Sequence, residues 1–297
     1  MKKPLIVGIG EFLWDMFPDE KRPGGAPANV VYNASQLGAE GYLVSRVGDD
    51  ANGVEIVSYL QGKGIHTHYI QVDGSSPTGT VEVSFDCQGE PHYNIVTSVA
   101  WDNIEFDEGL AELSKNCDAV VFGTLARRTK QSADAIKSFL EHTRRDTLKV
   151  LDMNFRPDGY SREIVVDSLQ LADIIKINLD ELEELKRLLD TGDPVTVMLN
   201  QYGVRGVCLT KGNEGSSWFE PGRQFHQQAH LTDNRQGDSV GLGDGFTSVL
   251  TLELLQQHSP EKALEKASRY TSLLARKPGG MPELEKDELS PFILRTG

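Results

Sequence analysis

One glycine-rich stretch combines the residue types needed to hold a phosphate and to move a proton. Residues 237–245 read Gly-Asp-Ser-Val-Gly-Leu-Gly-Asp-Gly, and apolar residues at helical spacing predict a helix from Asp244 to Gln257. Glycines let backbone N–H groups converge on one point, and a helix N-terminus adds roughly +0.5 of a charge there. Such a site binds phosphate oxygens, whereas the carboxylate of Asp244 would repel them. The pattern therefore predicts that Asp244 is a base that takes the proton of a hydroxyl group attacking the phosphate.

Further polar residues follow the carboxyl ends of predicted strands. In open parallel sheets, ligands bind beyond these ends. We therefore expect one rim to collect carboxylates, amides, an Arg and a Lys from four separate segments. These segments supply Asp152, Asn154 and Arg156; Asn178 and Glu181; the turn Thr210–Gly215 with Lys211; and Asp244.

The elements that position these residues alternate between strands and helices from about residue 103 onward. This alternation predicts an α/β fold, a parallel sheet with helices on both faces. Ser259 and Pro260 are typical of a helix start, and Pro278 ends that helix. The predicted strands are Asp118–Phe122, Leu148–Met153, Asp173–Asn178, Val195–Leu199 and Gly206–Thr210, and the predicted helices are Gln131–Arg144, Arg162–Leu171, Leu179–Leu189, Asp244–Gln257 and Pro260–Arg276.

The N-terminal third predicts a small second sheet. Gly79–Asp86 alternates apolar and polar residues, a turn follows at Gln88–Pro91, and His92–Thr97 completes an antiparallel hairpin with which Glu11–Phe17 could pair. We expect a β-sheet lid built from residues 11–26 and 71–101, inserted into an α/β body of residues 1–10, 27–70 and 102–297. In that body we predict strands at Leu5–Ile9 and Tyr42–Val47 and helices at Pro27–Leu37 and Asp50–Leu60.

Composition limits the classes of partner and location. The chain has 297 residues, 38% hydrophobic and 25% charged, and a net charge of −14. The negative charge disfavours broad binding to nucleic acid. No apolar run approaches the ~20 residues of a membrane helix, and the apolar start is too short for a secretory signal, so we expect a cytoplasmic protein. Cys87, Cys117 and Cys208 match neither a disulfide framework nor a zinc site.

Taken together, five motifs in order resemble the ribokinase-like (phosphofructokinase-B type) family of ATP-dependent sugar kinases, over nearly the whole chain. The segment Gly10–Asp19 followed by Gly24-Gly25-Ala26-Pro27-Ala28-Asn29 looks most like the fructokinases. The resemblance implies the ribokinase-like sandwich, and ATP, Mg²⁺ and a monovalent cation such as K⁺. The five motifs are Gly24–Asn29, Asp152-x-Asn154-x-Arg156, Asn178-x-x-Glu181, Thr210–Gly215 and Asp238–Asp244.

The resemblance also implies a role for each matching residue. Asp244 would be the catalytic base, with an anion hole formed by the backbone N–H groups of Gly241, Leu242 and Gly243. The sugar would be held by Asp15, Gly25, Asn29 and Arg156. The nucleotide would lie against Asn178, Thr210 and Gly212. Glu181 would reach Mg²⁺ through water, and Asp238 with the carbonyl of Val240 would bind the monovalent cation.

Two departures from the family pattern affect this site. Leu242 stands where the family usually has Ala between two glycines, so its side chain must point away from the phosphate for the anion hole to form. Lys277 extends the segment Ala275–Gly280, where the family tends to have Arg-Pro-Gly-Ala. It could alter the adenine or the cation edge of the site.

The lid favours a neutral sugar. No Lys or Arg lies between Lys63 and Lys115, whereas the hairpin carries Glu82, Asp86 and Glu90. A phosphorylated or acidic sugar would need cationic partners there. A neutral ketohexose is therefore the first choice, with 2-keto-3-deoxygluconate as the acidic alternative and a nucleoside as a third.

Two other classes are weighed against a sugar kinase. A non-catalytic sugar or nucleotide sensor on the same scaffold would explain the two departures, but the intact Asp244 and Asn29 oppose it. A dinucleotide-binding oxidoreductase is disfavoured, because Gly8-x-Gly10 lacks the remaining glycine and the helix start. The exposed lid sheet could pair with a second lid, so a homodimer is plausible.

Overall fold

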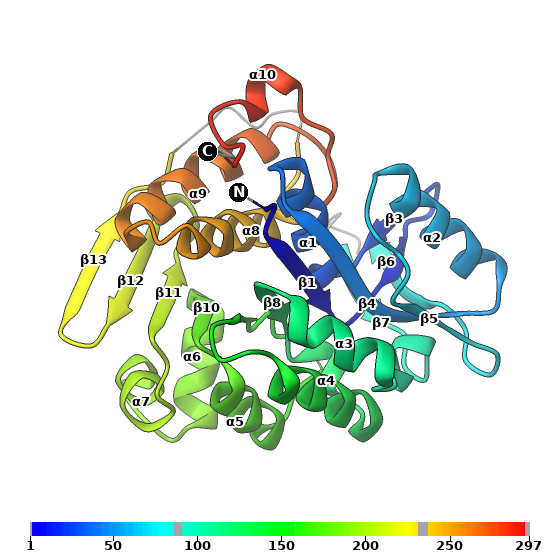
Figure 1. Cartoon of the computed structure of the whole chain (residues 1–297), viewed down its shortest axis with the longest axis horizontal. Helices are drawn as coiled ribbons and strands as arrows, with labels where there is room; N and C mark the ends of the chain where they lie inside the picture. Colours follow the sequence, from blue (N-terminus) through cyan, green and yellow to red (C-terminus); the bar gives the residue numbers. More distant parts are fainter. Residues whose placement is uncertain (1, 86–90, 158, 231–236, 295–297) are drawn as a thin grey trace.

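The computed structural model describes residues 2–85, 91–157, 159–230 and 237–294. Within these residues a nine-stranded sheet runs in the order β13-β12-β11-β10-β9-β8-β1-β4-β5 (Figure 1). The pairs from β5 to β11 are parallel, and β12 and β13 add an antiparallel edge. The predicted parallel sheet is thus confirmed. Its strands are β1 (Leu5–Ile9), β4 (Glu40–Gly48), β5 (Ile70–Asp73), β8 (Ala119–Phe122), β9 (Leu148–Asp152), β10 (Ile174–Asn178), β11 (Gly206–Thr210), β12 (Ser216–Glu220) and β13 (Arg223–Gln227).

Helices cover both faces of this sheet (Figure 1). Successive side chains of a strand point to opposite faces, and both sets are apolar here: Val7 and Ile9 pack into one core, Ile6 into the other. The first face is covered by α3 (Glu108–Asn116), α4 (Lys130–His142), α5 (Arg162–Leu171), α6 (Leu179–Leu188) and α7 (Pro194–Gln201), and the second by α1 (Ala26–Gln36), α8 (Leu242–Leu255) and α9 (Pro260–Leu274).

The small sheet predicted for the lid is present. Its order is β3-β2-β6-β7, made of β3 (Lys21–Gly24), β2 (Leu13–Met16), β6 (Gly79–Phe85) and β7 (Pro91–Ile95). β6 and β7 form the expected antiparallel hairpin, and β2 pairs with β6 in parallel. Trp14 packs beneath the sheet and donates its indole N–H to the carbonyl of Asn52 at 3.1 Å, on α2 (Ala51–Gly62). The predicted turn at 88–90, together with Asp86, Cys87 and Glu90, lies outside the described residues.

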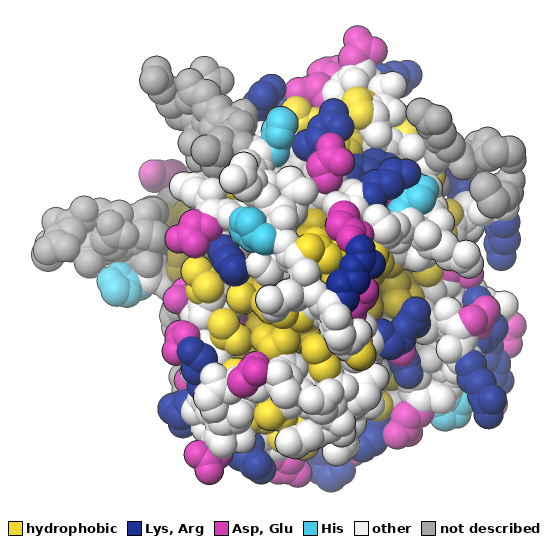
Figure 2. All heavy atoms as spheres, turned by 90° about the vertical axis from the view of Figure 1, so that its left-hand side faces the viewer, with side chains coloured by type: hydrophobic (Ala, Val, Ile, Leu, Met, Phe, Trp, Pro, Cys, Tyr) yellow, Lys and Arg dark blue, Asp and Glu magenta, His cyan; other side chains and the backbone are white. Residues whose placement is uncertain are grey.

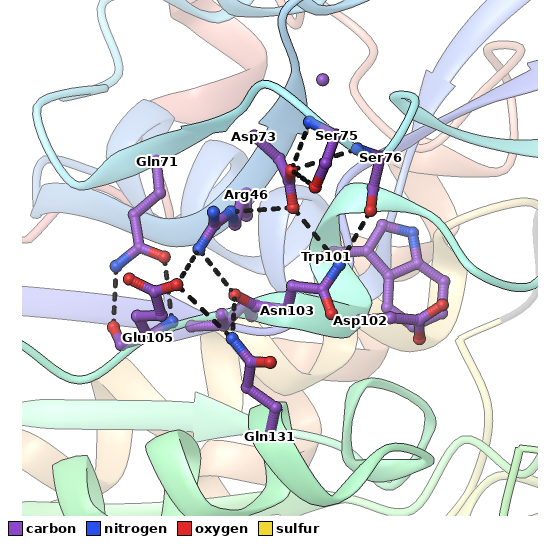
Figure 3. Close-up of polar contacts among 12 residues, drawn as sticks. Arg46, Gln71, Asp73, Ser75, Ser76, Trp101, Asp102, Asn103, Glu105 and Gln131 are labelled. Carbon is purple, nitrogen blue, oxygen red and sulfur yellow. Dashed lines mark hydrogen bonds and ion pairs between the residues drawn. The ribbon is translucent and has the colours of Figure 1, made fainter.

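A hydrogen-bonded network fixes the root of the lid (Figure 3). The Asp73 carboxylate, at the end of β5, accepts hydrogen bonds from the N–H and Oγ of Ser75 at 2.8 and 2.7 Å and from the N–H of Ser76 at 3.0 Å. Its other oxygen lies 3.2 Å from both Arg46 Nε and Asn103 Nδ2. Asn103 belongs to the short 3₁₀ helix η1 (Ala100–Asn103), so the network joins the segments on either side of β6 and β7.

One predicted element is wrong. Val195–Leu199 was expected to be a strand, but it lies within helix α7. Asp193 caps this helix by accepting the N–H of Thr196, and Pro194 occupies the first turn, where its missing N–H costs nothing. The local capping signals outweigh the β-branched residues that suggested a strand.

Several elements were not predicted. The strands β12 and β13 follow the turn Thr210–Gly215, and α3 precedes the strand predicted at Asp118–Phe122. β13 forms the outer edge of the large sheet and faces the viewer in Figure 2, where apolar side chains gather between charged ones. Among the described residues, no helix is long and apolar enough to cross a membrane.

Candidate active site

The glycine loop leads directly into α8, as expected. The helix begins at Leu242, two residues earlier than predicted, and its N-cap is Gly241 in the left-handed conformation with φ 73°. A side chain at Gly241 would also collide with the backbone of Gly280. The first backbone N–H groups of a helix have no partner within it, so the N–H groups of Leu242 and Gly243 are available at this end. The loop therefore has the geometry of an anion-binding helix N-terminus.

Asp244 lies in the first turn of α8 and contacts the helix that carries the sugar motif. Asn29 Nδ2, on α1, donates to Asp244 Oδ2 at 2.7 Å. Burial raises the pKa of Asp244 to about 6, and repulsion from Asp152 adds to this, while Asn29, Lys176 and Arg156 oppose it. A carboxyl group with this pKa is largely ionised at neutral pH and is close to the value that suits a general base.

A buried ion pair underlies the glycine loop. Lys176 Nζ, on β10, lies 2.9 and 3.1 Å from the two carboxylate oxygens of Asp152, and Thr247 Oγ1 donates to Asp152 at 2.7 Å. A Cβ atom at Gly243 would lie 2.9 Å from Lys176 Nζ, so the ammonium group sits against the backbone of the loop. Lys176 was not predicted as a site residue. A lysine inside the apolar run Ile174–Ile177 was the available signal.

The residues predicted to hold the sugar gather near Asp244. Arg156 is exposed just after β9 and interacts electrostatically with Asp15, Glu11 and Asp244. Burial raises the pKa of Asp15 to about 6, and Arg156 and Arg22 partly offset this. Gly25 has φ 114°, and a side chain there would collide with the Glu11 carbonyl oxygen. Asp15, Gly25, Asn29 and Arg156 therefore come together from β2, α1 and the segment after β9.

A cavity of about 470 Å³ adjoins the other side of the glycine loop. Thr210 and Gly212 line it, as do Leu242 and Gly243 of the predicted anion hole. Its size and mixed lining are those of a small-molecule pocket. The remaining walls come from the turn after β11, from α8 and from α9, and they are Asn213, Gly215, Ser216, Ala229, His230, Phe246, Ser268, Thr271, Ser272 and Ala275.

Asn178 and Glu181 make a reciprocal helix cap. Asn178 Oδ1 accepts the N–H of Glu181 at 2.8 Å, and Glu181 Oε2 accepts the N–H of Asn178 at 2.7 Å. Glu181 Oε1 accepts the N–H of Phe155 at 3.1 Å. Burial raises the pKa of Glu181, and Lys176 opposes the shift. Glu181 is thus a buried residue that joins α6 to the segment after β9, and each oxygen keeps one lone pair for a water molecule.

The carboxylate of Asp238 links three segments. It accepts the N–H of Val240 at 3.0 Å and that of Gly279 at 3.1 Å, and Arg22 NH1 lies 3.2 Å from its Oδ2. The predicted cation loop therefore already contacts one positive charge, contributed by β3 of the lid. Arg22 was not predicted to reach this loop, because the two segments are far apart in the chain.

The two departures from the family pattern have clear positions. The Leu242 side chain packs against the core beneath α8 and α9 and lines the cavity, while its backbone N–H stays at the helix start. Lys277 points toward the C-terminal segment, where its Nζ donates to the carbonyl of Glu283 at 2.7 Å and lies 3.5 Å from Glu288.

The lid contains more cations than the stretch between Lys63 and Lys115 suggested. The expectation of a lid without cations is therefore wrong, because β3 contributes Lys21 and Arg22. Both charges are already matched, because Lys21 pairs with Glu55 and Arg22 pairs with Glu20 and Asp238.

Comparisons over the whole chain match it to sugar kinases. A model of the pfkB family carbohydrate kinases matches residues 17–287. A fructokinase of Zea mays is 25% identical over 95% of this chain and 95% of its own. A solved fructokinase of Xylella fastidiosa with bound ATP has a TM-score of 0.85 and 21% identity over 98% of both chains. A fructokinase double mutant of Vibrio cholerae O395 with fructose, ADP and potassium ion has a TM-score of 0.79 and 20% identity over 98% of both chains. The family model covers most of the sequence, and this chain belongs to the pfkB family of carbohydrate kinases.

Proposed function

We propose that this chain transfers the γ-phosphoryl group of ATP to a hydroxyl group of a neutral sugar, with fructose as the first candidate. The position of Asp244 carries this proposal. Its carboxylate is hydrogen-bonded to Asn29 on the side of Asp15 and Arg156, and it follows directly after Gly243, which lines the cavity on the other side. A base between an alcohol site and a nucleotide site is the arrangement that phosphoryl transfer to a hydroxyl requires.

The reaction depends on positioning and electrostatics. Asp244 accepts the proton of the sugar hydroxyl as its oxygen attacks the phosphorus atom. The N–H groups of Gly241, Leu242 and Gly243 hold oxygens of the transferring group, and the Lys176 ammonium beneath Gly243 adds positive potential there. Thr210 and Gly212 would hold the nucleotide in the cavity, and Asn178 would keep α6 in place beside it.

Mg²⁺ fits the site as an ion held mainly by ATP. When bound, it neutralises charge on the β- and γ-phosphates. No cluster of three or more acidic, His or Cys side chains that could hold a metal occurs among the described residues. Glu181 is the protein residue that we assign to the Mg²⁺ ion, through water.

A monovalent cation such as K⁺ is assigned to Asp238 and the carbonyl of Val240. Oxygen donors of this kind suit K⁺. Because Arg22 already lies 3.2 Å from Asp238, the cation and the guanidinium group would compete for the same carboxylate.

The charges around Asp244 support a neutral acceptor over 2-keto-3-deoxygluconate. Glu11, Asp15 and Asp244 all interact with the guanidinium of Arg156. Arg22 also acts on Asp15 and Lys176 on Asp244, but these two cations are paired with Asp238 and Asp152, so acidic groups outnumber the unpaired cations around them. A carboxylate on the sugar would add another negative charge to this group. A nucleoside or a non-catalytic sensor are the remaining alternatives, and neither gains a specific supporting contact.

A substrate screen tests the proposal. ATP consumption is followed with Mg²⁺ and K⁺ present, with fructose and other ketohexoses, ribose, nucleosides and 2-keto-3-deoxygluconate as acceptors. We expect turnover with a neutral ketohexose. Activity with the acid alone would contradict the charge argument, and tight sugar binding without turnover would favour the sensor.

The setting of the enzyme is also a proposal. Cys117 and Cys208 are buried free thiols, which suits a reducing compartment such as the cytoplasm. A homodimer through the lid sheet would cover exposed side chains such as Tyr93. Sedimentation of the wild-type protein and of Tyr93→Asp tests the dimer, since a charge in the interface would shift it to monomer.

A further inference from the structure

Glu11 is a buried acidic residue for which the sequence predicts no role in the site. It lies in the turn between β1 and β2, and 3% of it is exposed to solvent. Its Oε1 accepts the N–H of Ala26, the first residue of α1, at 3.3 Å. The N-cap residue of α1 is Gly25, which has no side chain to accept this hydrogen bond. Glu11 therefore caps α1 from outside the helix.

The second carboxyl oxygen of Glu11 has no such partner. Oε2 is fully buried and accepts no hydrogen bond from any described residue. Leaving a buried polar atom unpaired costs about 1–3 kcal/mol, so such atoms are uncommon unless a ligand completes them. The Oδ1 atom of Asn29, one turn along α1 from Ala26, is unpaired among the described residues in the same way.

These two atoms specify the chemistry of the missing partner. Asn29 Oδ1 is an acceptor, and Glu11 Oε2 is an acceptor when the carboxyl group is ionised, which with a pKa of about 7 is the main form above pH 7. In that form each oxygen needs a hydrogen-bond donor. The phosphates of ATP offer acceptors and negative charge, which would repel Glu11. A sugar hydroxyl offers a donor without charge. The unpaired oxygens therefore match the alcohol substrate and not the nucleotide.

Glu11 also belongs to the same electrostatic group as the predicted base. Asp244 and Arg156 both interact with it. Asn29, which shares its unpaired state, donates its other side-chain group to Asp244 at 2.7 Å. Burial raises the pKa of Glu11 to about 7 and repulsion from Asp244 adds to this, while its own backbone N–H, that of Ala26 and Arg156 oppose the shift.

We propose that Glu11 is an additional residue of the acceptor site, whose Oε2 accepts a hydrogen bond from one sugar hydroxyl while its Oε1 caps α1. This inference rests on the proposed sugar kinase activity and names a further determinant of its specificity. A site that holds a hydroxyl through a buried acceptor discriminates strongly against the analogue that lacks that hydroxyl. Glu11 should therefore select the acceptor by one particular hydroxyl group.

The variants Glu11→Gln and Glu11→Ala separate the two oxygens. Gln retains a carbonyl oxygen for the N–H of Ala26 but replaces the other oxygen with an NH₂ donor. Ala removes both. Glu112→Gln, on the exposed surface of α3, controls for the loss of one negative charge. Steady-state kinetics and calorimetric titration of fructose, or of the sugar that the screen selects, are measured for each protein.

For Glu11→Gln we expect the KM and the Kd for the sugar to rise at least about tenfold. The KM for ATP should stay close to wild type, as it should throughout for Glu112→Gln. The melting temperature of Glu11→Gln should not fall, because the pKa of Glu11 is raised in the folded protein and the neutral amide avoids the cost of a buried charge above pH 7. If Glu11 acts only as a cap, Glu11→Gln will bind sugar like wild type and Glu11→Ala alone will be impaired. That result would overturn the inference.

A set of monodeoxy sugars identifies the hydroxyl group. In wild type, the analogue that lacks the contacted hydroxyl should bind at least about tenfold more weakly than the parent sugar. In Glu11→Gln that difference should disappear for this analogue and persist for the others. Equal penalties in both proteins for every analogue would overturn the inference while leaving the kinase proposal intact. A wild-type protein that neither binds nor phosphorylates any sugar would overturn both.

Discussion

Two buried carboxyl groups in this molecule have opposite surroundings. Asp73 at the root of the lid and Glu11 beside Asp244 are each 3% exposed. Asp73 has donors on both oxygens, from two backbone N–H groups, Ser75 Oγ and Asn103, and it forms an ion pair with Arg46 (Figure 3). Glu11 accepts the N–H of Ala26 on Oε1, its own backbone N–H also favours the ionised form, and its Oε2 has no partner among the described residues. Burial raises the pKa of both groups, more strongly for Glu11, which lies deeper in the protein and reaches about 7, whereas the donors and Arg46 hold that of Asp73 at about 2.

The difference separates a structural carboxylate from functional ones. A carboxylate that the protein surrounds with donors stabilises the fold in its ionised form. Glu11, Asp15 and Asp244 are short of donors, and each has a pKa raised by burial. In their ionised form these carboxyl groups lower the free energy of unfolding. A substrate with hydroxyl groups would supply the hydrogen-bond donors that they lack. Substituting the structural carboxylate Asp73 and the functional carboxylate Asp244 tests this difference.

The largest effect is expected for Asp244→Asn. Asn keeps the size of the side chain but cannot accept the proton, so kcat should fall at least about 100-fold. Stability should change in the opposite direction. The pKa of Asp244 is raised from 3.8 to about 6 in the folded protein, so its favourable contribution exists below about pH 4 and is lost as the pH rises through 6. Thermal unfolding at pH 8 should therefore show a higher melting temperature for the variant.

Comparison at two pH values controls this prediction. The stability gain of Asp244→Asn should be on the order of 2–3 kcal/mol at pH 8 and should shrink toward pH 4, where wild-type Asp244 is protonated in both states. Retained turnover would refute the assignment of the base. A lower melting temperature at pH 8 would refute the contrast with Asp73.

Asp73→Asn should have the reverse pattern. Its pKa is lowered to about 2 in the folded protein, so its stabilisation is present above about pH 4 and is lost as the pH falls through 2. We expect a loss of about 2 kcal/mol in the free energy of unfolding at pH 7, measured with urea, because the amide replaces an acceptor that several donors need. Turnover per folded molecule should stay within about threefold of wild type, because ordinary hydrogen-bond losses outside the site act on stability.

Ser75→Ala provides a graded control for the lid root. It removes one of the donors and leaves the charge of Asp73 in place, so its cost should be smaller, about 1 kcal/mol. Equal stability of Asp73→Asn and wild type would mean that the network contributes nothing to folding.

The pH dependence of kcat/KM tests the raised pKa values directly. Asp244 and Asp15 both have a pKa of about 6, and the base must be ionised to act. Activity should therefore fall about tenfold per pH unit below 6 and reach a plateau only above about 8, because Glu11, which must be ionised to accept a sugar hydroxyl, has a pKa of about 7. The apparent pKa belongs to the coupled group as a whole. Asp15→Asn should lower kcat/KM but retain its decrease at acidic pH. If kcat/KM of the wild type decreased only near pH 4, the base would be well solvated, which would contradict the raised pKa.

The sequence predicted the parts of the site that local pattern encodes. The glycine loop with Asp244, the Gly24–Asn29 segment and the strand ends each carry their signal within a few residues, and the structure brings Asp15, Asn29, Arg156 and Asp244 into one group. Their individual roles stay predictions. The strand predicted at Val195–Leu199 failed because β-branched residues were weighed above the cap at Asp193 and Pro194.

The sequence did not predict contacts that join distant segments. The sequence pattern places Glu11 in a possible strand of the lid and Lys176 in an apolar strand. For Arg22 it predicts no contact. Each acquires its importance from a partner far along the chain: Ala26 and Asp244 for Glu11, Asp152 for Lys176, and Asp238 for Arg22. Periodicity predicts which face of a helix or strand a residue occupies, but it does not predict which residues of other elements contact that residue.

The smallest effect is expected for Arg22→Ala, which tests whether a donor on a functional carboxylate competes with a ligand. The side chains of Arg22 and Asp238 are 34% and 31% exposed, so their ion pair is worth up to about 1 kcal/mol. Removing the guanidinium should free Asp238 for K⁺ and increase the activation of kcat/KM by KCl over choline chloride at equal ionic strength by up to about fivefold. Lys21→Ala, on the same strand but paired with Glu55, should leave the K⁺ response unchanged. An equal K⁺ response in wild type and Arg22→Ala would mean that Arg22 and the cation do not share Asp238, and that this carboxylate, with its N–H donors from Val240 and Gly279, belongs with Asp73 among the structural ones.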